Sequence, residues 1–153
     1  MDIVKGKINA PVRAVAYGPE GIGKTTLAAA WPAPLFVDAE AGTLRLAVDR
    51  VQPKSWAAVE QAVVDLTKGS EYKTLVFDTA DWLEKMLVES VCAKQNKTSI
   101  EDFGYGKGFT HLGEAWKKFL DQVNRMQDAT GMHVLFLAHA AMRKFEQPDE
   151  AGA

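Results

Sequence analysis

The sequence predicts an α/β fold of three layers, in which a mainly parallel sheet carries helices on both of its faces. Short apolar runs of strand length alternate along the chain with longer segments whose apolar residues recur at helical spacing. A glycine-rich segment follows the first apolar run and precedes the first helical segment, which is typical of a phosphate-binding loop. Alternating strands and helices indicate a parallel sheet, because each helix returns the chain to the starting end of the next strand.

The predicted elements follow one another along most of the chain. The first strand covers 12–17, and the first helix runs from the glycine-rich segment to Trp31, where the following prolines stop it. Ser55 is the expected N-cap of one helix, and Gly131 is the expected stop of another. The remaining elements are a strand over 35–37, a helix over 56–68, a strand over 74–77, a helix over 80–93, a polar glycine-rich loop over 94–109, a helix over 110–129 and a strand over 134–138.

The composition is that of a single globular domain over residues 1–153. Hydrophobic residues make up 47% of the chain and charged residues 25%, which is enough apolar material for a core. A single cysteine excludes an internal disulfide, and with three histidines it leaves no zinc-type cluster. No apolar run reaches the length of a signal peptide or a membrane span, so we expect a cytoplasmic protein without a membrane partner. Because the net charge is −2, any contact with nucleic acid requires a local basic patch.

The glycine-rich segment at 18–25 matches the complete phosphate-loop pattern G-x-x-x-x-G-K-[ST]. Its glycines let backbone N–H groups curl around an anion, and the helix that follows adds further unpaired donors. Lys24 can reach the β- and γ-phosphates, and the Thr25 hydroxyl can bind Mg²⁺. The alternative, a glycine-rich turn with a surface lysine, does not require these flanking elements. The predicted nucleotide-binding residues are Gly18, Pro19, Glu20, Gly21, Ile22, Gly23, Lys24, Thr25 and Thr26.

Polar residues follow the other predicted strands, and these strand ends meet at one edge of a parallel sheet. Asp78 ends the run LVFD, the pattern of a Walker B carboxylate that holds Mg²⁺, although an aspartate there can also cap a helix. Glu40 is a candidate to polarise the attacking water, with Asp38 as a weaker competitor. His139 is a candidate to bind the γ-phosphate and report its loss, and the alternative is a histidine satisfied at a strand end.

These motifs resemble the RecA-type ATPase core. More narrowly, the chain is similar to phage-encoded RecA-like nucleotide-binding proteins, a group that includes single-strand annealing proteins. The resemblance covers nearly the whole chain. It rests on GPEGIGKTT followed in order by VDAE at 37–40, LVFD at 75–78 and VLFLAHAAMRK at 134–144, and on SIEDFGYGKGF at 99–109.

The resemblance implies an ATPase that uses ATP and Mg²⁺. By position, Lys24, Glu40 and His139 take the catalytic roles, and Thr25 and Asp78 hold the metal. The strand that ends at His139 would lie between the two Walker strands. Because proteins of this kind continue with further strands, we expect the chain to be truncated at its C-terminus.

Two segments are expected to leave the same sheet edge and to face single-stranded DNA, as the resemblance implies. Residues 94–109 interleave lysines, which can track phosphates, with aromatic side chains, which can stack on bases. The alternative is a connector whose aromatic side chains tuck into the core. In the segment from Ala140 onward, Arg143 or Lys144 is a candidate to act on the nucleotide of a neighbouring subunit, or else a solvated basic residue. The candidate DNA-binding residues are Lys94, Lys97, Tyr105, Lys107 and Phe109.

The leading functional hypothesis is a phage ATPase of DNA recombination or single-strand annealing that binds single-stranded DNA and self-associates. It would act in the cytoplasm of the infected bacterial host, with a phage or host single-strand DNA-binding protein as a further partner. One alternative is a P-loop kinase acting on a small molecule, although no arginine-rich lid is evident. The other alternative is a nucleotide-gated loader or packaging module with negligible turnover.

Overall fold

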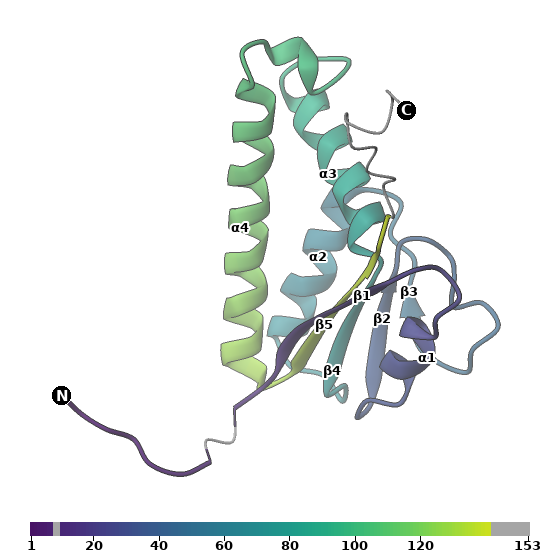
Figure 1. Cartoon of the computed structure of the whole chain (residues 1–153), viewed down its shortest axis with the longest axis vertical. Coiled ribbons are helices and arrows are strands. Elements are labelled where there is room, and N and C mark those ends of the chain that lie inside the picture. The colour runs from purple at the N-terminus through teal and green to yellow at the C-terminus, as the bar shows by residue number, and fades with distance from the viewer. Residues whose placement is uncertain (8–9, 142–153) are drawn as a thin grey trace, which may run out of the picture.

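The computed structural model describes residues 1–7 and 10–141 (Figure 1). Its centre is a five-stranded sheet in the order β1-β5-β4-β2-β3, and every neighbouring pair is parallel. β5 therefore lies between β1 and β4, the two strands that carry the Walker motifs, as the resemblance implies. The predicted α/β fold is confirmed. The strands are β1 Arg13–Gly18, β2 Pro34–Asp38, β3 Asp49–Val51, β4 Thr74–Asp78 and β5 His133–His139.

Two helix ends coincide with the local sequence signals that predict them. The Ser55 hydroxyl accepts a hydrogen bond from the Ala58 N–H at 3.3 Å, which caps α2. Gly131 takes a left-handed conformation with φ of 69° and closes α4. The helical elements are α1 Lys24–Ala29, α2 Trp56–Thr67, α3 Ala80–Lys94, the 3₁₀-helix η1 Glu101–Phe103 and α4 Lys107–Thr130.

Helices cover both faces of the sheet, but unequally. α1 covers one face, where Ala28 packs with Phe36, Val76 and Leu135. α2, α3 and α4 cover the opposite face and enclose the larger core. Alternate residues of β4 and β5 belong to that core, because successive side chains of a strand point to opposite faces, and Phe77 of β4 packs edge-on against Phe119 of α4. The three-layer arrangement positions the carboxyl ends of β1, β2, β4 and β5 along one open edge.

The structure differs from the predicted elements in three places. The three-residue strand β3 was not predicted, because a short edge strand with two charged residues carries no apolar run. α1 ends at Ala29, two residues before the predicted stop at Trp31. Residues 94–109 are not a loop: Lys94 is the last residue of α3, η1 lies in the middle, and α4 already begins at Lys107.

The prediction of a loop over 94–109 rested on its glycines, which in the structure allow close packing of helices instead. Gly106 takes φ of 71° just before α4. A Cβ at Gly108 would clash with the Ile100 carbonyl oxygen, so only glycine allows this close approach. The glycines therefore join η1 tightly to the first turn of α4, where a loop was expected.

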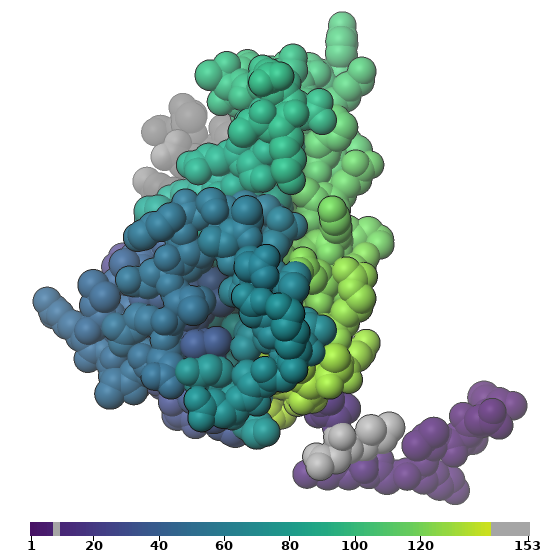
Figure 2. Space-filling model, turned by 180° about the vertical axis from the view of Figure 1, so that it is seen from behind, coloured from purple at the N-terminus to yellow at the C-terminus, as the bar shows by residue number. Residues whose placement is uncertain are grey.

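α3 and α4 form a helical hairpin that extends well beyond the sheet (Figure 1). The fifteen residues of α3 correspond to about 22 Å of helix, so the segment after α3 is carried away from the sheet edge. We call residues 94–109 the hairpin tip. Figure 2 shows this end of the molecule opposite the N-terminal residues. In the part of the chain that the structure describes, no helix has the length and apolarity of a membrane span.

Candidate active site

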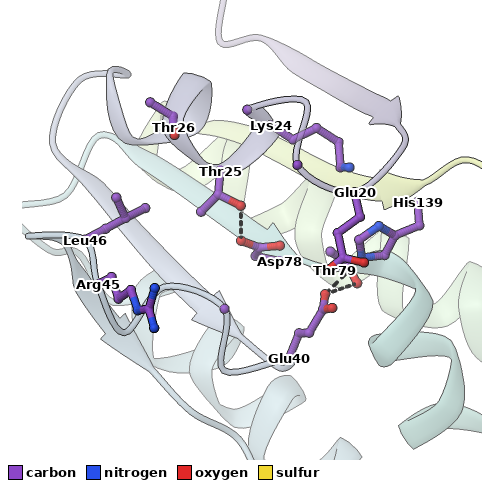
Figure 3. A pocket seen from close by; sticks show the side chains of 13 residues that line it. Glu20, Lys24, Thr25, Thr26, Glu40, Arg45, Leu46, Asp78, Thr79 and His139 are labelled. Carbon is purple, nitrogen blue, oxygen red and sulfur yellow. Dashed lines mark hydrogen bonds and ion pairs between the residues drawn. The ribbon is translucent and has the colours of Figure 1, made fainter.

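The four strand ends surround a cavity of about 350 Å³ (Figure 3). Among the predicted residues, Glu20, Gly21, Gly23, Lys24, Thr25, Thr26, Glu40, Asp78 and His139 line it. The sheet order brings them together, since β1, β4 and β5 are neighbours and β2 pairs with β4. Of the predicted nucleotide-binding residues, Gly18, Pro19 and Ile22 do not line the cavity, and the Ile22 side chain is exposed.

The phosphate loop is curled between the end of β1 and the start of α1. Gly21 and Gly23 take φ values of 78° and 99°, which side chains with a Cβ adopt only with strain. The Lys24 ammonium donates hydrogen bonds to the carbonyl oxygens of Gly18 at 2.8 Å and Pro19 at 2.9 Å. Lys24 thus braces the loop from inside, and its charge lies where an anion held by the loop would be neutralised.

Thr25 and Asp78 face one another across the floor of the cavity. The Thr25 hydroxyl donates a hydrogen bond to Oδ2 of Asp78 at 2.9 Å. A hydroxyl and a carboxylate oxygen are the hard ligands that Mg²⁺ prefers, so this pair fits the ion. Within residues 1–7 and 10–141, no group of three or more His, Cys, Asp or Glu side chains could hold a metal. A Mg²⁺ ion here would therefore complete its coordination with phosphate oxygens and water.

The environment of Asp78 opposes its negative charge. Burial raises the pKa of the Asp78 carboxyl, and the neighbouring carboxylates of Asp38 and Glu40 raise it further. The hydrogen bond from Thr25 and the charge of His139 act in the opposite direction but are weaker in sum. A divalent cation beside Asp78 would relieve this cost, which is a physical reason for a metal at this position.

Asp78→Asn is expected to raise the melting temperature of the nucleotide-free protein at pH 7.5 by a few degrees, because it removes a charge that burial disfavours. Because the pKa of the Asp78 carboxyl is higher in the folded than in the unfolded state, its ionisation lowers the stability of the wild type. This loss of stability is absent below the unfolded pKa of about 3.9 and grows as the pH rises through the folded pKa. The gain of the variant should therefore shrink between pH 7.5 and pH 4. Melting curves across this range, with and without Mg·ATP, measure it; ATP should stabilise the wild type but not the variant. A variant less stable than the wild type at pH 7.5 would contradict this account.

Glu40 is held by two neighbours inside the cavity. Its Oε2 lies 3.1 Å from Nε2 of His139 and accepts a hydrogen bond from the Thr79 hydroxyl at 3.3 Å. The side chains of Glu40 and His139 are 29% and 31% exposed, so both reach the cavity and its water. The backbone N–H of His139 donates to Oδ2 of Asp81 at 2.8 Å. The end of β5 is thereby tied to the first turn of α3.

Asp38, the competing carboxylate, has a different environment. It is only 2% exposed, and its oxygens accept hydrogen bonds from the Gly42 N–H, the Thr43 N–H and the Thr43 hydroxyl at 3.0, 3.3 and 2.6 Å. Asp38 does not line the cavity. Its carboxylate organises the backbone that follows β2, whereas Glu40 is the carboxylate that can meet water near the phosphate loop.

Sequence reasoning did not find every residue of the site. Thr79 and Asp81 begin α3, and Arg45 and Leu46 line the cavity from the segment after β2. The only local signal for Thr79 was its place directly after Asp78. No sequence pattern indicated Arg45, because its position depends on the backbone after β2, which hydrogen bonds to Asp38 hold in place. Arg143 and Lys144 lie outside the described residues.

The candidate DNA-binding residues lie at the hairpin tip, away from the cavity. Phe103 is partly buried against the core, with the Lys97 ammonium 6.0 Å from its ring centre, so this aromatic side chain does tuck inward. Tyr105 is fully exposed and Phe109 is 61% exposed. Lys94, Lys97 and Lys107 are exposed as well. The tip thus offers cations and two free aromatic faces in the same short segment.

Comparison with known proteins agrees with the site. No curated protein shows significant similarity to this chain. The family described as AAA domain matches residues 10–152, a region that contains the phosphate loop, all five strands and the cavity. Because this match covers nearly the whole sequence, the chain belongs to the AAA domain family of P-loop ATPases.

Proposed function

We propose that the protein is a Mg²⁺-dependent ATPase that binds single-stranded DNA, self-associates and acts in phage DNA recombination or single-strand annealing. One observation carries the hydrolytic part: Glu40 is hydrogen-bonded to both His139 and Thr79 in the cavity that Lys24 and Thr25 line. Such a carboxylate, held in place but open to water, is what a water-activating residue requires.

Five residues around the phosphate loop have separate tasks in this reaction. Lys24 neutralises the β- and γ-phosphates, and Thr25 with Asp78 would hold Mg²⁺, which would withdraw charge from the phosphate oxygens. Glu40 orients a water molecule and accepts its proton as the water oxygen attacks the γ-phosphorus and the bond to ADP breaks. His139, at the end of β5, joins Glu40 to the position of the γ-phosphate. Loss of the γ-phosphate would therefore act on its contact with Glu40.

The start of α3 supports a link between the cavity and the hairpin tip. Thr79 bonds to Glu40 and Asp81 bonds to the backbone of His139, and both residues belong to the first turn of α3 or its cap. A helix transmits displacement along its axis as a rigid element. Changes at Glu40 or His139 would thus reach the residues at the far end of α3, which include Lys94.

The composition of the hairpin tip supports single-stranded DNA as the ligand. Exposed lysines can track the phosphates while Tyr105 and Phe109 stack on bases without reading their identity. The local charge is modest and the net charge is −2, so binding by one subunit should be weak. Assembly of several subunits along one strand would strengthen it. The likeness to phage RecA-like proteins in sequence supports the recombination role.

ATP hydrolysis measured with and without single-stranded DNA tests the proposal. The expected result is turnover that requires Mg²⁺ and rises when DNA is added. Tight ATP binding with negligible turnover in both conditions would favour the loader or packaging module. Phosphate transfer to a small molecule, with no response to DNA, would favour the kinase.

Tyr105→Ala is expected to weaken single-stranded DNA binding about fivefold or more, since stacking on one base contributes about 1–3 kcal/mol. Lys107→Ala is expected to weaken it as well, because it removes a cation that contacts the phosphate backbone. Affinity for ATP should stay nearly unchanged, because the tip is a helix length away from the cavity. Fluorescence anisotropy with a labelled oligonucleotide at two salt concentrations measures the effect, and wild-type affinity should fall steeply with salt. Lys117→Ala, on the same helix but paired with Asp121, is the matched control. Wild-type DNA affinity in both tip variants would remove the DNA site from the hairpin.

A further inference from the structure

One wall of the cavity takes no part in the phosphate chemistry described above. Arg45 and Leu46 line it, from the segment between β2 and β3. In Figure 3 they lie on the same side of the cavity as Thr26, away from His139. In the part of the chain that the structure describes, no hydrogen bond or ion pair engages the Arg45 guanidinium. The cavity therefore has a cationic, planar side chain and an apolar side chain with no assigned role.

Hydrogen bonds hold the backbone of this wall in place. Asp38 ties down the backbone of Gly42 and Thr43 through the three hydrogen bonds described above. The Leu46 N–H donates to the Thr43 carbonyl at 2.8 Å, and the Arg50 guanidinium donates to the Leu46 carbonyl at 2.6 Å. The backbone that presents Arg45 and Leu46 is thus anchored on both sides, so the two side chains project from a fixed support.

The direction in which a nucleotide lies in the phosphate site determines which part of it would contact this wall. Lys24, Asp78, Glu40 and His139 define the γ-phosphate end of the cavity, and the loop N–H groups hold the phosphates that precede it. The sugar and the base must leave the cavity at the other end, on the side of Thr26. We infer that Arg45 and Leu46 hold the nucleoside of the bound nucleotide, with the guanidinium plane stacked on the base and Leu46 packed beside it. This inference rests on the proposed nucleotide site.

This contact has a consequence for base selection. A guanidinium stacks on any aromatic face and carries only donors, and Leu46 makes only apolar contact. Among the described residues that line the Thr26 side of the cavity, none has a carboxylate or amide side chain that could accept a hydrogen bond from the 6-amino group of adenine. The face of the base is recognised and its edge is not. The site therefore accepts ATP and GTP with similar affinity.

Calorimetric titration with Mg·ATP, Mg·GTP and Mg·tripolyphosphate, the last lacking a nucleoside, tests this assignment. The wild type is expected to bind ATP and GTP within about tenfold of each other. Arg45→Ala should weaken both nucleotides by about five- to thirtyfold and leave tripolyphosphate affinity unchanged, since cation–π stacking in a partly desolvated site is of this size. Leu46→Ala should show the same pattern with a smaller loss. Arg125→Ala, an exposed arginine on α4 outside the cavity, is the matched control.

Three results would overturn the inference. Equal losses of ATP and tripolyphosphate in Arg45→Ala would make Arg45 a phosphate ligand. Unchanged nucleotide affinity in that variant would remove it from the site. A preference of the wild type for ATP over GTP of more than about a hundredfold would show that the base edge is read. Because calorimetry measures binding alone, a lack of hydrolysis or of DNA stimulation would contradict the proposed function without altering these affinities.

Discussion

Lys24→Ala is expected to abolish tight binding of Mg·ATP, with a loss of affinity of about a hundredfold or more. The ammonium is the only side-chain cation of the phosphate loop, and in the proposed nucleotide site it would face the β- and γ-phosphates. Two charge-assisted hydrogen bonds of about 1.5–3 kcal/mol each account for a loss of this size. The substitution also removes the bonds to the Gly18 and Pro19 carbonyls that brace the loop.

Isothermal titration calorimetry measures this loss directly. Lys54→Ala, an exposed lysine outside the cavity, is the matched control and should bind Mg·ATP like the wild type. The melting temperature of Lys24→Ala without nucleotide should fall by no more than a few degrees, because only the two bonds that brace the loop are lost, and this measurement separates lost binding from lost folding. Unchanged affinity in a folded Lys24→Ala protein would contradict the assignment of the phosphate site.

Glu40→Gln is expected to retain Mg·ATP binding and to reduce turnover by about a hundredfold or more. The amide can still accept the hydrogen bond from Thr79, so the local geometry persists, but it cannot take a proton from water. Losses of about 10²–10⁴-fold are typical when a general base is removed. Steady-state hydrolysis together with calorimetric affinity separates the effect on turnover from any effect on binding.

Asp38→Asn provides the comparison that decides between the two carboxylates. Its side chain is buried and accepts bonds from Gly42 and Thr43, so its loss should lower stability by about 1–3 kcal/mol and the melting temperature by several degrees. Turnover per folded molecule should fall less than in Glu40→Gln. If Asp38→Asn abolishes turnover in a stable protein while Glu40→Gln remains active, the catalytic carboxylate has been misassigned.

The sequence by itself determined the features that depend on neighbouring residues in the chain. The glycine spacing and Lys24 of the phosphate loop, the apolar runs of β1, β2, β4 and β5, and the N-cap at Ser55 are all local patterns. Their physical causes act over a few residues: glycine allows positive φ, apolar runs need burial, and a hydroxyl caps an exposed N–H. The alternation of these elements was enough to predict a parallel sheet with a nucleotide site at the carboxyl ends of its strands.

Only the tertiary structure decided which residues share the site and how each is held. Asp38 and Glu40 are two positions apart after the same strand, and no local pattern separates them; burial and hydrogen bonding do. Glu40 meets Thr79 and His139 across 39 and 99 residues of chain, because β4 and β5 lie beside β2 and β1 in the sheet. The hairpin tip was misjudged because the need of Gly108 to pack against Ile100 exists only once α3 and α4 are side by side. Contacts of this kind depend on the order of the strands and the packing of the helices, which nearest-neighbour patterns in a sequence do not contain.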